Sequence, residues 1–200
     1  MFPYIINSQR SGIPVNAGWQ PFDHFADATR QAELNQMASE IPKYWQGVRY
    51  DAFTIRGALA CLQERQPRVL YVALGETDDW AHAGRYDLYL HAAEQSDSYL
   101  RRLWETAQSL TTHRGRTTMI VTTDHGRGDG RESWKSHGES LPESDRIWIA
   151  AIGPKIPALG VRSDVQATQS QVAASVAAAC DETFGTADQS IATPIDFTAQ

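Results

Sequence analysis

The residue types best suited to chemistry gather in a few short loops. The stretch Thr122-Thr123-Asp124-His125-Gly126 follows the apolar run Met119-Ile120-Val121. A carboxylate beside an imidazole suits a divalent ion such as zinc or manganese. In open α/β sheets, ligands collect where strands end, which favours a binding site at this position. An ordinary turn with an incidental histidine would have the same sequence, so the neighbouring loops decide between the two readings.

Two more loops carry similar residues. Residues 76–84 hold Asp78 and His82 after the apolar run 68–75, and residues 134–138 hold His137 just before a glycine. Asp78 and His82 stand four residues apart, so a helical turn would place both on one side, where they could hold one ion. Asp79, three residues before His82, would also reach it.

Continuous apolar runs predict the strands that position these loops. We expect strands over residues 68–75, 117–123 and 146–152. Runs without alternation are typical of parallel strands that are covered on both faces. The segment from 68 to 123 is long enough for a strand–helix–strand unit with a right-handed crossover.

Apolar residues at three- and four-residue steps predict the helices, over residues 27–41, 54–66, 86–109 and 168–181. Thr54 is a candidate N-cap for the second helix, and Pro67 would end it. Thr168 and Gln171 match a capping box at the start of the last helix.

Composition excludes several classes of protein. The chain has 200 residues, enough for one domain, and 18 basic against 24 acidic residues give a net charge of −6. This charge argues against binding a nucleic-acid scaffold through a basic surface. No stretch reaches the roughly 20 apolar residues of a membrane span, no signal peptide is recognisable, and the two cysteines form no metal-binding pattern.

In order along the chain, Asp78 with His82, then Thr123-Asp124-His125-Gly126, then His137-Gly138 resemble the C-terminal portion of the alkaline phosphatase superfamily. That superfamily includes nucleotide pyrophosphatase/phosphodiesterases, phosphopentomutases, cofactor-independent phosphoglycerate mutases and sulfatases. The resemblance implies part of a doubly wound, mostly parallel α/β sheet with helices on both faces. We therefore expect a single domain over residues 1–184, followed by a loosely ordered tail over 185–200.

The resemblance also implies a metal site with two divalent ions, zinc or else manganese. Asp78, His82 and His137 would bind one ion, and Asp124 with His125 would bind the other. The glycines after His125 and His137 would let the backbone pass close to the ions. Beside these ligands, Arg127 and Lys135 are candidates to bind a phosphate or sulfate group, and Glu76 is a candidate to orient a ligand histidine.

The implied activity is hydrolysis of phosphate mono- or diesters, or of sulfate esters, through a two-metal site. The family's nucleophile, a Ser, Thr or modified Cys at the end of an N-terminal strand, has no counterpart before residue 68; Ser8 and Asp23-His24 are better explained as structural. The sequence thus predicts a C-terminal portion that lacks its N-terminal half. Two alternatives stay open: a non-catalytic fragment with part of the metal site, and a mutase that moves phosphate within a sugar or glycerate.

Overall fold

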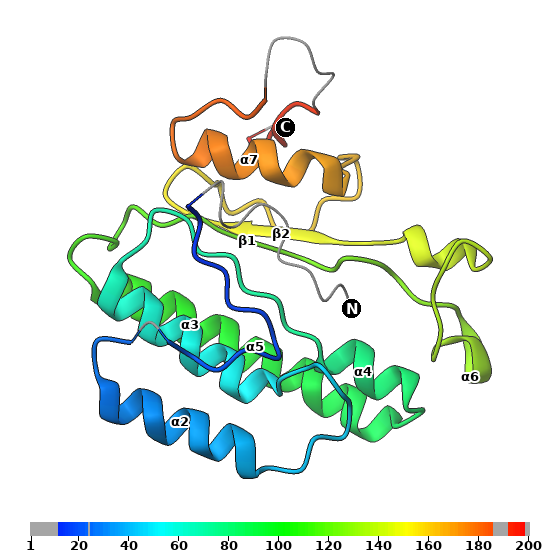
Figure 1. Ribbon diagram of the computed structural model, residues 1–200. Coiled ribbons are helices and arrows are strands. Elements are labelled where there is room, and N and C mark those ends of the chain that lie inside the picture. Colours follow the sequence, from blue (N-terminus) through cyan, green and yellow to red (C-terminus); the bar gives the residue numbers. More distant parts are fainter. Residues whose placement is uncertain (1–11, 24, 186–191, 199–200) are drawn as a thin grey trace. The chain divides into compact units, whose positions relative to one another are not determined.

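A computed structural model describes residues 12–23, 25–185 and 192–198 of the chain (Figure 1). It divides into two compact units, Met1–Thr106 and Ala107–Gln200, and each is described here by itself. The single domain predicted over 1–184 stays a prediction. The predicted loose tail lies partly outside the described residues; within its described part, the Ile195 N–H donates to the Ser175 hydroxyl at 2.9 Å.

The first unit is helical. It contains α2 (Ala28–Glu40), α3 (Asp51–Arg65), α4 (Glu76–His82) and most of α5 (Tyr86–Ser109) (Figure 1). The helices predicted over 27–41, 54–66 and 86–109 are confirmed. However, α3 begins at Asp51, so Thr54 lies inside the helix and the predicted Thr54 cap is wrong. At the other end Gln66 adopts a left-handed conformation with φ 47°, which stops the helix just before Pro67.

The core of this unit joins the loop before α2 to helices α2 and α3. Its buried side chains are Phe22, Phe25, Leu34, Phe53 and Ala60. The Phe22 and Phe25 rings lie 5.3 Å apart. Gly57 of α3 packs directly under the Phe22 ring, because any Cβ at this position would collide with that ring. Burial of each large apolar side chain contributes about 1.5–3 kcal/mol to the stability of the fold.

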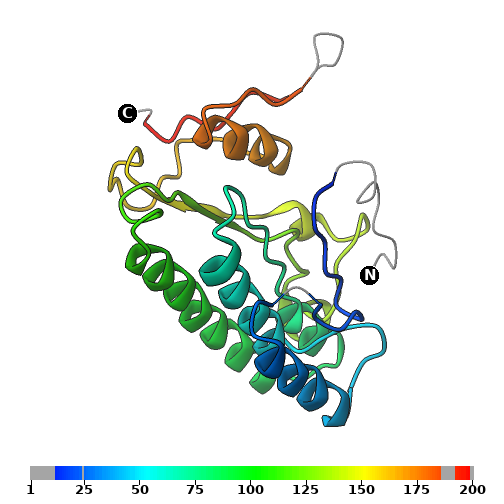
Figure 2. The same cartoon turned by 60° about the vertical axis from the view of Figure 1, so that its left-hand side comes forward.

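The second unit is built on a two-stranded ribbon. It contains β1 (Met119–Thr122), α6 (Gly130–Ser133), the 3₁₀ turn η1 (Pro142–Asp145), β2 (Ile149–Ile152), the 3₁₀ turn η2 (Gln169–Gln171) and α7 (Val172–Ala179). Helix α7 lies along one face of the ribbon in both views (Figures 1 and 2). The helix predicted over 168–181 is confirmed as η2 continuing into α7, and the Thr168–Gln171 capping box is present.

The predicted parallel, doubly wound sheet is wrong. Within the described residues the sheet has two strands, and they pair antiparallel with Met119 opposite Ile152 and Thr122 opposite Ile149. The predicted strands over 117–123 and 146–152 are confirmed in shortened form. Residues 68–75 form no strand, and Val69 and Tyr71 are 55% and 87% exposed rather than covered on both faces. Without that strand, the predicted strand–helix–strand crossover does not exist. An apolar run indicates a propensity for extended structure, but it does not specify which strand will be its partner.

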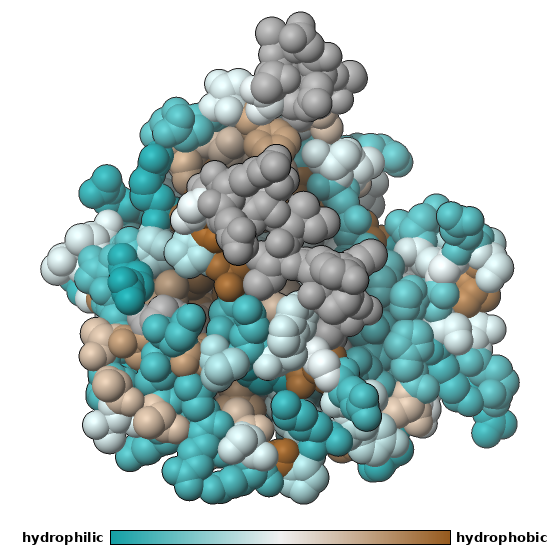
Figure 3. Space-filling model, in the orientation of Figure 1, coloured by the Kyte–Doolittle hydropathy of each residue, from teal (hydrophilic) through white to brown (hydrophobic). Residues whose placement is uncertain are grey.

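The face of the molecule drawn in Figure 3 is mainly polar. In the space-filling view, hydrophilic side chains dominate the visible face and the apolar ones form small separate patches (Figure 3). Across the described part of the chain, no helix combines the length and the apolar character needed to cross a membrane. The prediction that the chain has no membrane-spanning segment agrees with this finding.

Candidate functional site

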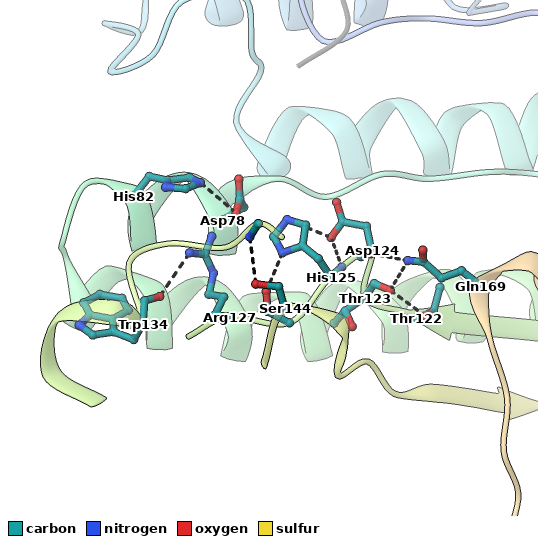
Figure 4. Close-up of polar contacts among 12 residues, drawn as sticks. Asp78, His82, Thr122, Thr123, Asp124, His125, Arg127, Trp134, Ser144 and Gln169 are labelled. Carbon is teal, nitrogen blue, oxygen red and sulfur yellow. Dashed lines mark hydrogen bonds and ion pairs between the residues drawn. The ribbon is translucent and has the colours of Figure 1, made fainter. Parts of the chain in front are cut away.

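Helix α4 brings Asp78 and His82 together in the first unit. The predicted helical turn is confirmed, and the four-residue spacing places both side chains on one face. The Nε2 atom of His82 lies 3.4 Å from Oδ1 of Asp78 (Figure 4). These side chains are 46% and 38% exposed, respectively, so both are accessible from solvent.

A reciprocal pair of carboxylates fixes the start of α4. The Asp51 carboxylate accepts hydrogen bonds from the backbone N–H groups of Gly75 at 2.9 Å and Glu76 at 3.1 Å. In return, Oε1 of Glu76 accepts from the Asp51 backbone N–H at 2.7 Å. Each acid thereby satisfies N–H groups at the beginning of the other's helix, where the helix dipole favours negative charge.

Aromatic side chains hold the side of α4 that faces away from Asp78. Two residues along a helix turn the side chain by roughly 200°, so Trp80 points away from Asp78 and His82. Its ring lies 4.4 Å from the Trp45 ring and 5.3 Å from the Tyr44 ring. Its indole N–H donates to Oε2 of Glu76 at 3.4 Å. Glu76 was a candidate to orient a ligand histidine; its carboxylate instead bonds to Asp51 and Trp80, at the base of the helix.

Four carboxylates make this end of α4 strongly acidic: Asp51, Glu76, Asp78 and Asp79. Burial raises the pKa of Asp51 to about 6, against the opposing effect of its backbone hydrogen bonds. Burial, and then the charges of Asp78 and Glu76, raise the pKa of Asp79 to about 6. This concentration of negative charge gives a cation at Asp78 and His82 an electrostatic advantage.

In the second unit, Asp124 and His125 follow β1 after a single residue, Thr123. The Gln169 side chain donates to the backbone oxygens of Thr123 at 3.0 Å and Asp124 at 2.5 Å, which fixes the chain where the strand ends (Figure 4). The Nε2 atom of His125 lies 3.7 Å from Oδ1 of Asp124. The Asp124 side chain is 87% exposed, so it can approach an ion without losing a buried partner.

The tautomer of His125 suits a metal ligand. Its Nδ1 atom lies 2.9 Å from the Gly126 carbonyl oxygen. Because a carbonyl oxygen can only accept, this contact assigns the proton to Nδ1 and leaves the Nε2 lone pair available in the neutral ring. Ligand histidines in metal sites commonly have their second nitrogen fixed in this way.

His137 joins His125 through a ring contact. The two imidazole rings stack with centroids 3.7 Å apart and an interplanar angle of 16°. The glycines after these histidines have a local role in the loop, and their predicted close approach to the ions stays a prediction. A Cβ on Gly126 would collide with the carbonyl oxygens of Glu143 and Arg146, so this glycine allows close approach of the chain's own backbone. Gly138 adopts φ 132°, a conformation that side chains disfavour.

The two predicted substrate-binding cations are engaged with nearby groups. Arg127 donates through Nη1 to the Trp134 carbonyl oxygen at 3.3 Å. The Lys135 ammonium forms an ion pair with Glu132 at 2.8 Å. Their predicted role in binding phosphate or sulfate stays a prediction.

The spacing of the donor atoms fits divalent metal coordination. Zinc lies about 2.0–2.2 Å from its nitrogen and oxygen ligands, so two ligand atoms of a tetrahedral ion are roughly 3.3–3.6 Å apart. The Asp78–His82 distance of 3.4 Å falls in this range, and the Asp124–His125 distance of 3.7 Å needs a slightly wider angle. In the metal-free protein the same contacts serve as ion pairs whenever the histidine is protonated.

Sequence reasoning missed three supporting residues, Asp51, Gln169 and Ser144. Asp51 bonds to residues 24 and 25 positions away, and Gln169 to residues 46 and 45 positions away, so no local pattern marks them. A nucleophile was not identified from the sequence. Of the early candidates, Ser8 and His24 lie outside the described residues.

Comparisons with protein-family models, curated proteins and solved structures gave no match to this chain. The chemical interpretation therefore depends on the residues themselves.

Proposed function

We propose that this chain is a divalent-metal-dependent hydrolase of phosphate mono- or diesters, or of sulfate esters, related to the alkaline phosphatase superfamily. The main support is that two separate Asp/His pairs, Asp78 with His82 and Asp124 with His125, have nitrogen–oxygen distances of 3.4 and 3.7 Å.

Each group of side chains has a defined part in this proposal. Asp78 and His82 supply a carboxylate and an imidazole from α4, and the surrounding acids favour a cation there. Asp124, His125 and His137 supply the second group of donors; the sequence assigned His137 to the ion of Asp78 and His82, and its stacking on His125 is the reason for placing it in this group. Bound divalent ions, zinc or manganese, would stabilise the charge on the ester's oxygens during displacement. The chain's residues fix the donors and keep them accessible to the ester.

The test combines metal binding with turnover. Isothermal titration of the chelator-treated protein with Zn²⁺ or Mn²⁺ should show at least one bound ion. His82→Ala and His137→Ala should each weaken affinity at least tenfold, because each removes a ligand from a small set. His91→Ala is the matched control, because His91 is exposed on α5 and should leave binding unchanged. Absence of binding to the wild-type protein, or identical binding by all three variants, contradicts the proposal.

Turnover is measured with p-nitrophenyl phosphate, its diester and its sulfate. With no nucleophile identified, water would have to attack directly, so we expect slow metal-dependent hydrolysis, far below about 10 per second. Removing metal with a chelator should abolish it.

A non-catalytic metal-binding protein is the second candidate. The absence of an identified nucleophile favours it. Metal binding at the same residues, with ester hydrolysis no faster than in buffer, would select this candidate.

A further inference from the structure

One serine connects the two histidines of the second unit. His125 and His137 are 12 residues apart in the sequence, yet their rings stack at 3.7 Å. The residue after each histidine is a glycine, and both glycine amides bond to Ser144. The Gly126 N–H donates to the Ser144 carbonyl oxygen at 2.8 Å, and the Gly138 N–H donates to the Ser144 hydroxyl oxygen at 2.9 Å.

The surrounding loop fixes Ser144 itself. The Ser144 N–H donates to the Leu141 carbonyl oxygen at 2.9 Å, and the Leu141 N–H donates to the Gly138 carbonyl oxygen at 2.9 Å. With the bond from Gly138 to the Ser144 hydroxyl, these contacts form a closed ring of three hydrogen bonds from residue 138 to residue 144. Ser144 is half-buried at the third position of η1, and its labelled side chain lies beside His125 in Figure 4.

We infer that Ser144 is a positioning residue that holds the rings of the two candidate metal ligands, His125 and His137, face to face, an inference that rests on the proposed function. The serine acts through the backbone that carries each ring. Its two acceptors are independent: the backbone oxygen fixes the loop of His125, and the hydroxyl fixes the loop of His137.

Because the two acceptors are independent, the contribution of the hydroxyl to the position of the His137 loop can be measured by itself. Ser144→Ala removes the acceptor of Gly138 and retains the acceptor of Gly126. The His137 loop should then lose its fixed position while the His125 loop keeps its own. Ser140→Ala is the matched control, because Ser140 is exposed in the same loop four residues away. Ser144→Thr retains the hydroxyl and should behave like the wild type, and Ser144→Cys, with a weaker acceptor, should give an intermediate result.

The first measurement needs no metal. Stacked imidazoles shift each other's ring-proton resonances, so NMR spectra of the chelator-treated protein report the stack directly. In Ser144→Ala the His125 and His137 ring protons should move towards the positions of isolated histidines, with backbone amide signals outside residues 124–146 unchanged. Ring protons that stay at their wild-type positions in both Ser144→Ala and Ser144→Cys overturn the inference, as does an equal change in Ser140→Ala.

The second measurement is Zn²⁺ affinity by titration. Loss of a group that orients a ligand typically weakens metal binding by about 10–100-fold. We expect a loss of this size for Ser144→Ala, and near wild-type affinity for Ser144→Thr and Ser140→Ala. If the wild-type protein binds no zinc, the proposed function fails, and the ring-proton experiment alone decides whether Ser144 positions the histidines. If zinc binds and Ser144→Ala binds it equally well, only the inference about Ser144 fails.

Discussion

At the scale of single residues, buried Asp51 has the most unusual environment. It is 4% exposed, yet its carboxylate accepts two backbone hydrogen bonds at the start of α4. Those bonds favour the charged form, while burial and the nearby Glu76 and Asp79 disfavour it. Burial dominates, so this residue couples the stability of the protein to pH.

Asp51 should make the metal-free protein less stable as pH rises. Its pKa in the folded protein is about 6, above the ordinary value of 3.8, so the folded state holds the proton more tightly. The free energy of unfolding should therefore be highest below about pH 4. It should decline as pH rises through about 6, by at most about 3 kcal/mol for this group. Urea unfolding at several pH values measures this decline.

The variant Asp51→Asn isolates the contribution, because other titrating groups are common to both proteins. Its unfolding free energy should fall less steeply between pH 4 and 7 than that of the wild type. Asparagine retains one acceptor oxygen but presents an N–H group to the second donor, so some stability is lost at every pH. Equal pH slopes for the two proteins would contradict this assignment.

At the scale of elements, side-chain caps fix the residues at which helices begin. Asp27 caps α2 by accepting the Arg30 N–H at 3.0 Å. Thr168 and Gln171 form the reciprocal cap of η2, which continues into α7. These contacts lie within three residues along the chain, which is why the capping box was recognisable from the sequence.

The Thr168 cap should contribute measurably to the second unit. Thr168→Ala removes the side-chain acceptor for the Gln171 N–H and should lower the free energy of unfolding by about 0.5–2 kcal/mol. Thr168→Ser retains the acceptor and is the control. Denaturant unfolding followed by circular dichroism compares the two, and equal stability of both variants would show that the cap contributes nothing.

At the scale of the whole molecule, charge is the property most closely linked to the proposed function. The chain carries a net charge of −6, and four acids gather at the start of α3 and along α4. Repulsion among them opposes folding in the absence of a cation. A bound divalent ion would offset that repulsion, which joins stability to metal binding.

Zinc or manganese should therefore raise the melting temperature of the chelator-treated protein. A ligand that binds only the folded state stabilises it by about 2.7 kcal/mol at 100 times its dissociation constant. The shift should shrink in His82→Ala and His137→Ala and persist in His91→Ala. A thermal scan with no shift at saturating metal would contradict the expectation.

The local features of this protein can be predicted from its sequence alone. It predicted α5 with both ends correct, the helical turn that pairs Asp78 with His82, and the capping box at Thr168. Each depends on contacts within about four residues, so the local order of side chains is sufficient.

The pairing of the strands and the long-range contacts at the site depend on tertiary structure. The apolar runs at 68–75, 117–123 and 146–152 look alike in sequence, yet only the last two pair, and they pair antiparallel. Likewise, the contacts of Asp51 with α4 and of Gln169 with the end of β1 join residues 24 to 46 positions apart. The contacts of Ser144 with Gly126 and Gly138 span fewer residues, but they also form only when the loop folds back. Such contacts form between the segments whose packing lowers the free energy of the folded chain most. The local pattern of residues does not contain this information.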